Sequence, residues 1–361
     1  MRRFAAFMAS GSAGAVRPGR LVAGGAPMIR SGPGHGRFAT LVLEGERLHL
    51  VVVPALGARV VSFVDCETGR DWLVQGEPPA DGAAAAAWAA PEAAFTGAVA
   101  YGWDECLPTV APCPDPVDPA RPALRDHGDA WGRPANVTET GGALVAEWEG
   151  MNWPYRLRRE MRVAGPALRT DYLLENRGSV ALPFLYSMHP LLALPAGARI
   201  EVGGLTSVLV SHAAGLRLSG LPRRVPWPRA IGSDGEPFAF DLVRAPLAGT
   251  AVKLYGGSDG AAGDRLPGQA AVTLPDGSGL ELAWSPAALP ALGLWLDDGG
   301  WPAAGGRVQH AIEPTTAPDD DLATAVADDR AMWVEAGGRV TWTATWRVRR
   351  PGEAREPAPV E

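Results

Sequence analysis

The chain has 361 residues, of which 47% are hydrophobic and 20% are charged, so it is long and apolar enough to bury a large core and is not a disordered polymer. Its formal net charge of −7 argues against a nucleic-acid or anionic-membrane partner, because both require basic surfaces. The same charge permits a neutral small molecule, and no apolar stretch reaches the length of a membrane-spanning helix.

The N-terminal part of the chain begins with a segment rich in Gly, Ala and Arg, whose apolar stretch is interrupted by Ser and Gly and makes a poor export signal. We expect a mobile extension over residues 1–36, within which Met28 is an alternative start. Alternating apolar and polar residues then predict β-strands at 47–53 and 58–65. The alanine-rich block 83–90 and the proline-rich stretch 114–122 are predicted to be surface loops.

The rest of the chain continues the same alternation between turn signals that contain Gly, Pro and Asp. It predicts strands at 143–150, 155–163, 168–176, 249–255, 279–285 and 339–350. In the last of these, Trp342, Ala344 and Trp346 share one face, whereas threonines occupy the other.

A short helix is predicted at 321–330, with acidic residues near its N-terminus, and residues 351–361 are expected to be a mobile tail. No change in composition divides the chain between its ends. The sequence therefore predicts an all-β protein, with residues 37–350 forming one large antiparallel β-sandwich with few short helices.

The cysteines set limits on redox state and metal binding. Cys66, Cys106 and Cys113 cannot all pair within one chain, and none of them has CxxC spacing. We therefore expect neither a disulfide framework nor a structural zinc site, and a reducing, cytoplasmic setting.

One histidine stands in an otherwise apolar run, FLYSMHPLLAL at 184–194. Pro190 has no amide hydrogen for a sheet ladder, so it should lie at a strand end or edge. His189 should then lie at the mouth of a site rather than deep in a core. The alternative is a core histidine satisfied by a backbone carbonyl.

Three other segments concentrate polar residues that strands do not need: YGWDECLPTV at 101–110, LRDHGDAWGRP at 124–134 and QHAIEPTTAPDDDL at 309–322. They contain His127 and Glu313, for which a loop histidine and a solvated charge at a strand end are the simpler interpretations. The other histidines, His35, His49, His212 and His310, are assigned surface or structural roles.

Five short motifs occur in the order LGARVVSF (56–63), GWDECLPT (102–109), HGDAW (127–131), HPLLAL (189–194) and IEPTT (312–316). In this order, over residues 38–350, the chain resembles the aldose 1-epimerases of the galactose mutarotase-like superfamily. The resemblance implies that superfamily's large antiparallel β-sandwich, the supersandwich, with a sugar-binding cleft across one sheet. It also implies a hexose-like small-molecule sugar as the ligand and no cofactor, nucleotide or metal.

Interconverting the α and β anomers of an aldose requires ring opening, in which a base takes the proton of the anomeric hydroxyl and an acid protonates the ring oxygen. By its motif, the resemblance implies that Glu313 is the general base and His189 the general acid. It also implies that His127 hydrogen-bonds the sugar near its ring oxygen.

Substrate-binding candidates come from the same motifs. Asp104 and Glu105 are candidates to accept hydrogen bonds from sugar hydroxyls, or to cap a turn. Trp131 is a candidate stacking platform. Trp295 and its neighbour Trp301 are candidates either for the cleft wall or for packing in the core.

Well-studied galactose mutarotases carry an arginine ahead of the first histidine and an aspartate that binds sugar hydroxyls, and neither stands in its expected motif here. The sugar is therefore not defined by the sequence. Two carboxylates near the site would repel phosphate unless Arg59 or Arg125 compensates, so a phosphorylated sugar is disfavoured.

Three other functions remain open on the sequence. The first is a non-catalytic carbohydrate-binding or sensor protein on the same fold. The second is a glycosidase that pairs Asp104 or Glu105 with Glu313. The third is a metal-dependent isomerase built from His127, His189 and Glu313. The sequence does not indicate the oligomeric state.

Overall fold

The computed structural model describes residues 2–3, 27–216, 218, 220–244, 249–257, 266–302 and 306–355. Most of the predicted N-terminal extension and the end of the predicted tail lie outside these residues. Within the extension, Met28–Ser31 form strand β2 and pair with Leu41–Glu44, strand β3, so this short part of it is a sheet edge.

Two large antiparallel sheets carry the fold. The first sheet has the strand order β1 (Arg2–Arg3), β8 (Asn136–Thr140), β9 (Ala143–Glu149), β10 (Tyr155–Ala164), β11 (Ala167–Asn176), β25 (Arg339–Arg349), β21 (Gly279–Trp284), β20 (Gln269–Thr273), β14 (Arg199–Val202). The second sheet has the order β16 (Arg223–Pro226), β15 (Ser207–Ala214), β19 (Ala251–Gly257), β22 (Ala291–Asp298), β23 (Val308–Thr315), β13 (Ser187–Pro190), β7 (Trp103–Cys106), β5 (Arg59–Asp65), β4 (Leu48–Val53), β3, β2.

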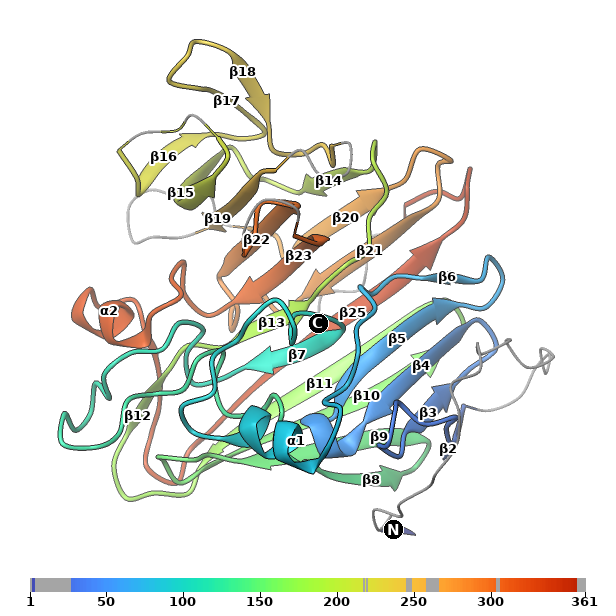
Figure 1. Ribbon diagram of the computed structural model, residues 1–361, viewed down its shortest axis with the longest axis vertical. Coiled ribbons are helices and arrows are strands. Elements are labelled where there is room, and N and C mark those ends of the chain that lie inside the picture. Colours follow the sequence, from blue (N-terminus) through green and yellow to red (C-terminus); the bar gives the residue numbers. More distant parts are fainter. Residues whose placement is uncertain are drawn as a thin grey trace.

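The remaining elements are short. Strand β6 (Arg70–Asp71) pairs with β5, β12 (Leu182–Phe184) with β24 (Met332–Val334), and β17 (Arg229–Ile231) with β18 (Pro237–Ala239). In the view of Figure 1, β4, β5 and β7 of the second sheet lie in front of β10 and β11 of the first. This two-layer antiparallel arrangement confirms the predicted β-sandwich.

The core between the layers comes from the alternation seen in the sequence. Along β25, Trp342, Ala344 and Trp346 are buried in it, whereas the intervening threonines are partly exposed or exposed. Strand β4 is buried on both faces: Leu50 joins this core, and Val51 joins a second apolar cluster on the outer face of the second sheet. The second sheet is therefore covered on its outer side as well, and the cavity described below lies beside that second cluster.

The helices differ from the sequence prediction at one place. The alanine-rich block predicted as a loop is helix α1 (Gly82–Ala89), whose first turn is capped by Asp81 accepting a 2.8 Å hydrogen bond from the amide of Ala84. Alanine has the highest intrinsic helix propensity, so the block folds as a helix although none of its residues is buried.

The second helix, α2 (Leu322–Ala327), confirms the prediction at 321–330, with Asp321 as its N-cap. A single 3₁₀ turn, η1, spans Pro54–Leu56. Within the described chain, neither helix has the length and apolar character that crossing a bilayer would need.

Candidate active site

A cavity of about 360 Å³ opens on the outer face of the second sheet. Its size falls within the roughly 300–1,000 Å³ typical of small-molecule sites. Its polar and aromatic lining residues are Phe95, Asp126, His127, His189, His212, Lys253, Trp295, Trp301, Gln309, Glu313 and Asp320. The cavity thus brings together Glu313, His189 and His127, the three residues predicted from the sequence to act on the sugar.

Strand alternation decides which side chains reach the cavity. On β23, Gln309 and Glu313 line it, whereas Ile312 faces the core between the sheets. On β13, His189 lines it, whereas Met188 is buried in that same core. Strand β13 ends at Pro190, as the missing amide hydrogen predicted.

His127 reaches the cavity from the loop that follows β7. Its backbone is left-handed, with φ of 55°, and its amide donates a 2.6 Å hydrogen bond to the carbonyl of Val110. The ring stacks on Phe95, with centroids 3.9 Å apart and an 8° angle between planes. Its Nδ1 is 2.7 Å from Oδ1 of Asp126, so Nδ1 carries a hydrogen, and in the neutral form of the ring Nε2 keeps its lone pair.

The charge on Asp126 supports that tautomer. Burial alone would raise the pKa of Asp126, but the hydrogen bond from His127 and the charge of that ring outweigh burial and lower the pKa below its usual value. Asp126 is therefore an ionised acceptor that fixes the orientation of the His127 ring.

His189 is a buried base in this site. Its Nδ1 is buried and has no hydrogen-bond partner among the described residues. Burial, then the charges of His127 and Lys253, lower the pKa of His189 well below 6.5, so the imidazole is neutral at neutral pH. Its ring lies 5.1 Å from that of His127, centroid to centroid.

Glu313 is held by an ion pair that the sequence did not suggest. Its Oε2 accepts a hydrogen bond from Nζ of Lys253 on β19, and Nζ also lies 3.7 Å from Oδ1 of Asp320. Burial would lower the pKa of Lys253, but these two carboxylates outweigh it and raise the pKa, so the ammonium stays charged. Oε1 of Glu313 is buried without a partner among the described residues and is the oxygen left to accept a proton.

A glycine makes room for this pair. Gly293 on β22 is directly opposite Glu313 in the register. A Cβ at this position would lie 2.8 Å from Oε2 of Glu313 and 3.4 Å from Nζ of Lys253. The close approach of carboxylate and ammonium over the strand therefore depends on the missing side chain.

The structure places Asp104 away from the cavity. It is 3% exposed and forms an ion pair with Arg59, whose Nη2 lies 2.6 Å from Oδ2. Arg59 also donates to the carbonyl of Val99 at 2.7 Å. In the described structure Asp104 is not among the cavity's lining residues, so the prediction that it contacts sugar is not supported.

Glu105, its neighbour on β7, points the other way, into the core between the sheets. It accepts hydrogen bonds from Arg159 at 2.8 Å, Tyr172 at 3.1 Å and Tyr186 at 2.6 Å. All of these groups are buried. Glu105 therefore connects the two layers. Neither Glu105 nor Asp104 lies where it could act with Glu313 as the carboxylate pair of a glycosidase.

Two of the three tryptophans considered as sugar contacts line the cavity, and the third does not. Trp295 and Trp301 both line the cavity, with ring centroids 6.1 Å apart and planes at 88°. Trp131 is 1% exposed, donates from Nε1 to the carbonyl of Asp126 and packs under Arg125. It supports the loop that carries His127 instead of facing the described cavity.

The two arginines considered for phosphate are also turned away from the cavity. Arg59 is engaged by Asp104, and Arg125 donates to backbone carbonyls, including that of Gly128 at 2.8 Å. The sequence prediction missed Lys253 and Asp320, which do line the cavity. A single lysine in the apolar strand segment GTAVKLY was the available signal for a buried, paired charge.

The default assignment of the remaining histidines is correct for His310 and incomplete for His212. His310 is 1% exposed and lies 3.1 Å from Oδ1 of Asp298, outside this cavity. His212, on β15, is exposed and lines the cavity. All three cysteines, which the structure describes, are free thiols.

Comparison with known proteins identifies the fold. No protein-family model and no curated protein matches the chain. Among solved structures, the "putative aldose 1-epimerase" of Klebsiella pneumoniae is 13% identical, covers 90% of this chain and 88% of its own, and gives a TM-score of 0.63. The Slr1438 protein of Synechocystis is 17% identical over 86% of this chain and 95% of its own, with a TM-score of 0.61.

A galactose mutarotase-like protein of Lactobacillus casei is 14% identical over 86% of this chain and 100% of its own, with a TM-score of 0.56. Identities this low establish the architecture and not the activity. The chain has the galactose mutarotase-like β-sandwich fold.

Proposed function

We propose that the protein is an aldose 1-epimerase-like mutarotase, which interconverts the α and β anomers of an aldose by general acid–base ring opening. The observation that carries this proposal is the meeting of Glu313, His189 and His127 in one cavity. They come from β23, β13 and a loop, and the fold is one shared with proteins named for this reaction.

In the proposed mechanism, Oε1 of Glu313 takes the proton of the anomeric hydroxyl while Lys253 holds Oε2. The imidazolium of His189 gives its proton to the ring oxygen, and the C1–O5 bond breaks to form the open-chain aldehyde. Rotation about C1–C2 presents the other face of the carbonyl, and the reverse transfers close the ring. His127, fixed by Asp126, hydrogen-bonds the sugar through its second nitrogen.

The lowered pKa of His189 sets a cost for this mechanism, because only a small share of empty sites carries the imidazolium at neutral pH. Each pKa unit corresponds to about 1.36 kcal/mol. The same neutrality, together with the Lys253 contact to Glu313, favours the second candidate, a carbohydrate-binding protein that uses the same residues without catalysis.

Charge in the cavity bears on the substrate. Three carboxylates, Asp126, Glu313 and Asp320, line it, against one described ammonium group, Lys253, which is already paired with two of them. Phosphate would meet net negative charge here. We therefore propose a neutral aldose as the substrate.

Anomer exchange tests the proposal directly. Freshly dissolved α-glucose and α-galactose would be followed by polarimetry and by NMR exchange between the anomers, with and without the protein. A mutarotase accelerates exchange above the buffer rate. Sugar binding without acceleration would reject the enzyme in favour of the carbohydrate-binding protein.

A further inference from the structure

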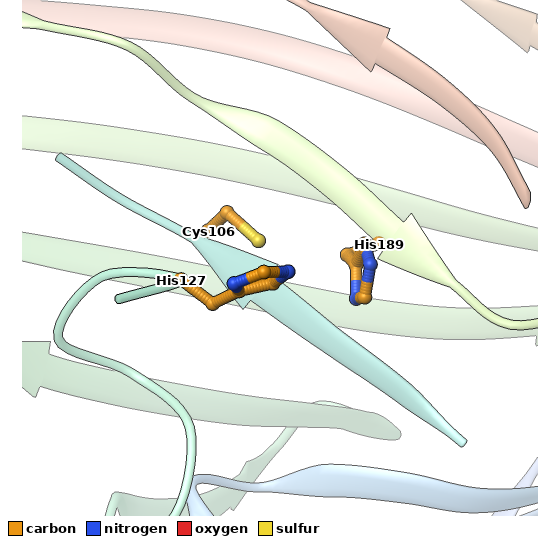
Figure 2. Close-up of side chains that lie close together, drawn as sticks. All are labelled: Cys106, His127 and His189. Carbon is orange, nitrogen blue, oxygen red and sulfur yellow. The ribbon is translucent and has the colours of Figure 1, made fainter. Parts of the chain in front are cut away.

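A buried thiol, Cys106, lies beside the two histidines of the proposed mechanism and has no part in that mechanism. Cys106 lies on β7, His189 on the neighbouring strand β13, and His127 on the loop that covers them. One ligand atom from each of the three lies within 4.8 Å of the other two. Figure 2 shows the three side chains directed toward one shared space.

The strand register explains how this cluster forms. Cys106 is directly opposite Ser187, and His189 is opposite Asp104, so Cys106 and His189 project from the same face of two paired strands. His127 closes the third side because its left-handed backbone turns the ring over the sheet. Strand pairing and one loop thus bring residues that are far apart in the sequence to one place.

Both histidines have a ring nitrogen that can bind a metal ion. Asp126 accepts the Nδ1 hydrogen of His127, which leaves the Nε2 lone pair free, and a carboxylate behind a ligating histidine is the usual outer partner in metal sites. Phe95 fixes the plane of that ring. His189 offers a buried nitrogen, Nδ1, that has no partner elsewhere in the described chain.

We propose that Cys106, His127 and His189 form a binding site for a divalent metal ion of the zinc class. One thiolate and two imidazoles match the nitrogen and sulfur preference of Zn²⁺. Tetrahedral Zn²⁺ would hold its ligand atoms about 3.3–3.6 Å apart, which is inside the 4.8 Å within which these three atoms lie. Three protein ligands would leave one tetrahedral position for a water molecule.

The ion and the sugar reaction compete for the same nitrogen atoms. Binding replaces the thiol hydrogen of Cys106, which is released to the buffer as a proton, and uses a lone pair of each imidazole. This consequence rests on the proposed function: with both rings bound to the ion, neither delivers a proton to a ring oxygen. Zn²⁺ is therefore an inhibitor of the metal-free mutarotase.

Metal binding is measured on the full chain after treatment with a chelator, without reference to activity. Co²⁺ is titrated while the near-ultraviolet thiolate-to-cobalt absorption is recorded, and Zn²⁺ is then used to displace it. The expected result is one equivalent of Co²⁺ with a thiolate band. Absence of that band at one equivalent overturns the proposal.

Matched variants locate the site. Cys106→Ala should remove the thiolate band and weaken Zn²⁺ binding at least about 100-fold, whereas Cys113→Ala, another buried free cysteine, should bind as wild type does. Asp126→Asn keeps all three ligands and should weaken binding about 10–100-fold. Equal affinity in wild type and a folded Cys106→Ala variant, checked by circular dichroism, overturns the assignment.

Activity then separates this proposal from the proposed function. Anomer exchange by the metal-free protein should be stopped by stoichiometric Zn²⁺ and restored by chelator, and Cys106→Ala should resist the same Zn²⁺ concentration. Undiminished exchange in the Zn²⁺-loaded wild type overturns the inhibition. A protein that binds Co²⁺ through Cys106 but never exchanges anomers refutes the mutarotase and leaves the metal site established.

Discussion

Replacing Glu313 with glutamine tests the central chemical assignment with the least change in shape. The amide oxygen of glutamine can still accept the hydrogen bond that Lys253 now donates to Oε2. The amide is not a base, so no group remains to take the anomeric proton. A positioned base contributes roughly 10²–10⁴-fold, or about 2.7–5.4 kcal/mol of barrier, and we expect Glu313→Gln to lose at least that much rate.

The control is Asp320→Asn. This substitution also removes one of the two carboxylates that neutralise the buried ammonium of Lys253, at 3.7 Å, but it leaves the base in place. Both variants should therefore lose stability to urea, because each leaves Lys253 with less compensating charge. Only Glu313→Gln should lose most of its anomer exchange, measured by polarimetry at equal folded protein concentration.

Two outcomes would refute this reasoning. Exchange by Glu313→Gln within about tenfold of wild type would show that another group removes the proton. An equal loss in Asp320→Asn would show that the rate depends on the charge balance around Lys253 and not on the carboxylate as a base.

Three further predictions concern the site and, in the last case, a buried histidine outside it. His189→Asn should lower kcat about 10²–10⁴-fold, whereas His127→Asn should also raise KM, as saturation kinetics with each anomer would show. Gly293→Ala should fold but lose exchange, because its Cβ would displace the Glu313 carboxylate 2.8 Å away; unchanged exchange would contradict this. Burial lowers the pKa of His49, so the unfolded state binds more protons than the folded state does. The free energy of unfolding should therefore fall as the pH drops below about 6.5. Urea titrations of His49→Gln should show a shallower dependence of this free energy on pH.

The strands were accessible from sequence because one buried and one exposed face leave a period-two pattern. Strand β25 shows this best, since its tryptophans face the core and its threonines do not. Helix α1 was missed because a uniform alanine run has no periodicity, so its only signals were alanine's propensity and the Asp81 cap.

A site residue could be predicted where a polar side chain stands at a recognisable strand end, as His189 does before Pro190. It could not be predicted where its role depends on which distant residue lies beside it in the fold. Asp104 and Glu105 are adjacent, so they point to opposite faces of β7, and each meets a different arginine. The sequence gives no indication of which arginine is near. Lys253 was overlooked for the same reason, since only the register places it beside Glu313.

The buried contact between Glu105 and Arg159 limits how this protein can diverge. Losing one member of such a pair costs about 3–5 kcal/mol, against a total stability of about 5–15 kcal/mol for a typical domain. Replacing both together by apolar residues of similar volume is often neutral. Homologous chains that keep this sandwich should therefore carry both charges or neither, and the two positions should vary as a correlated pair across an alignment.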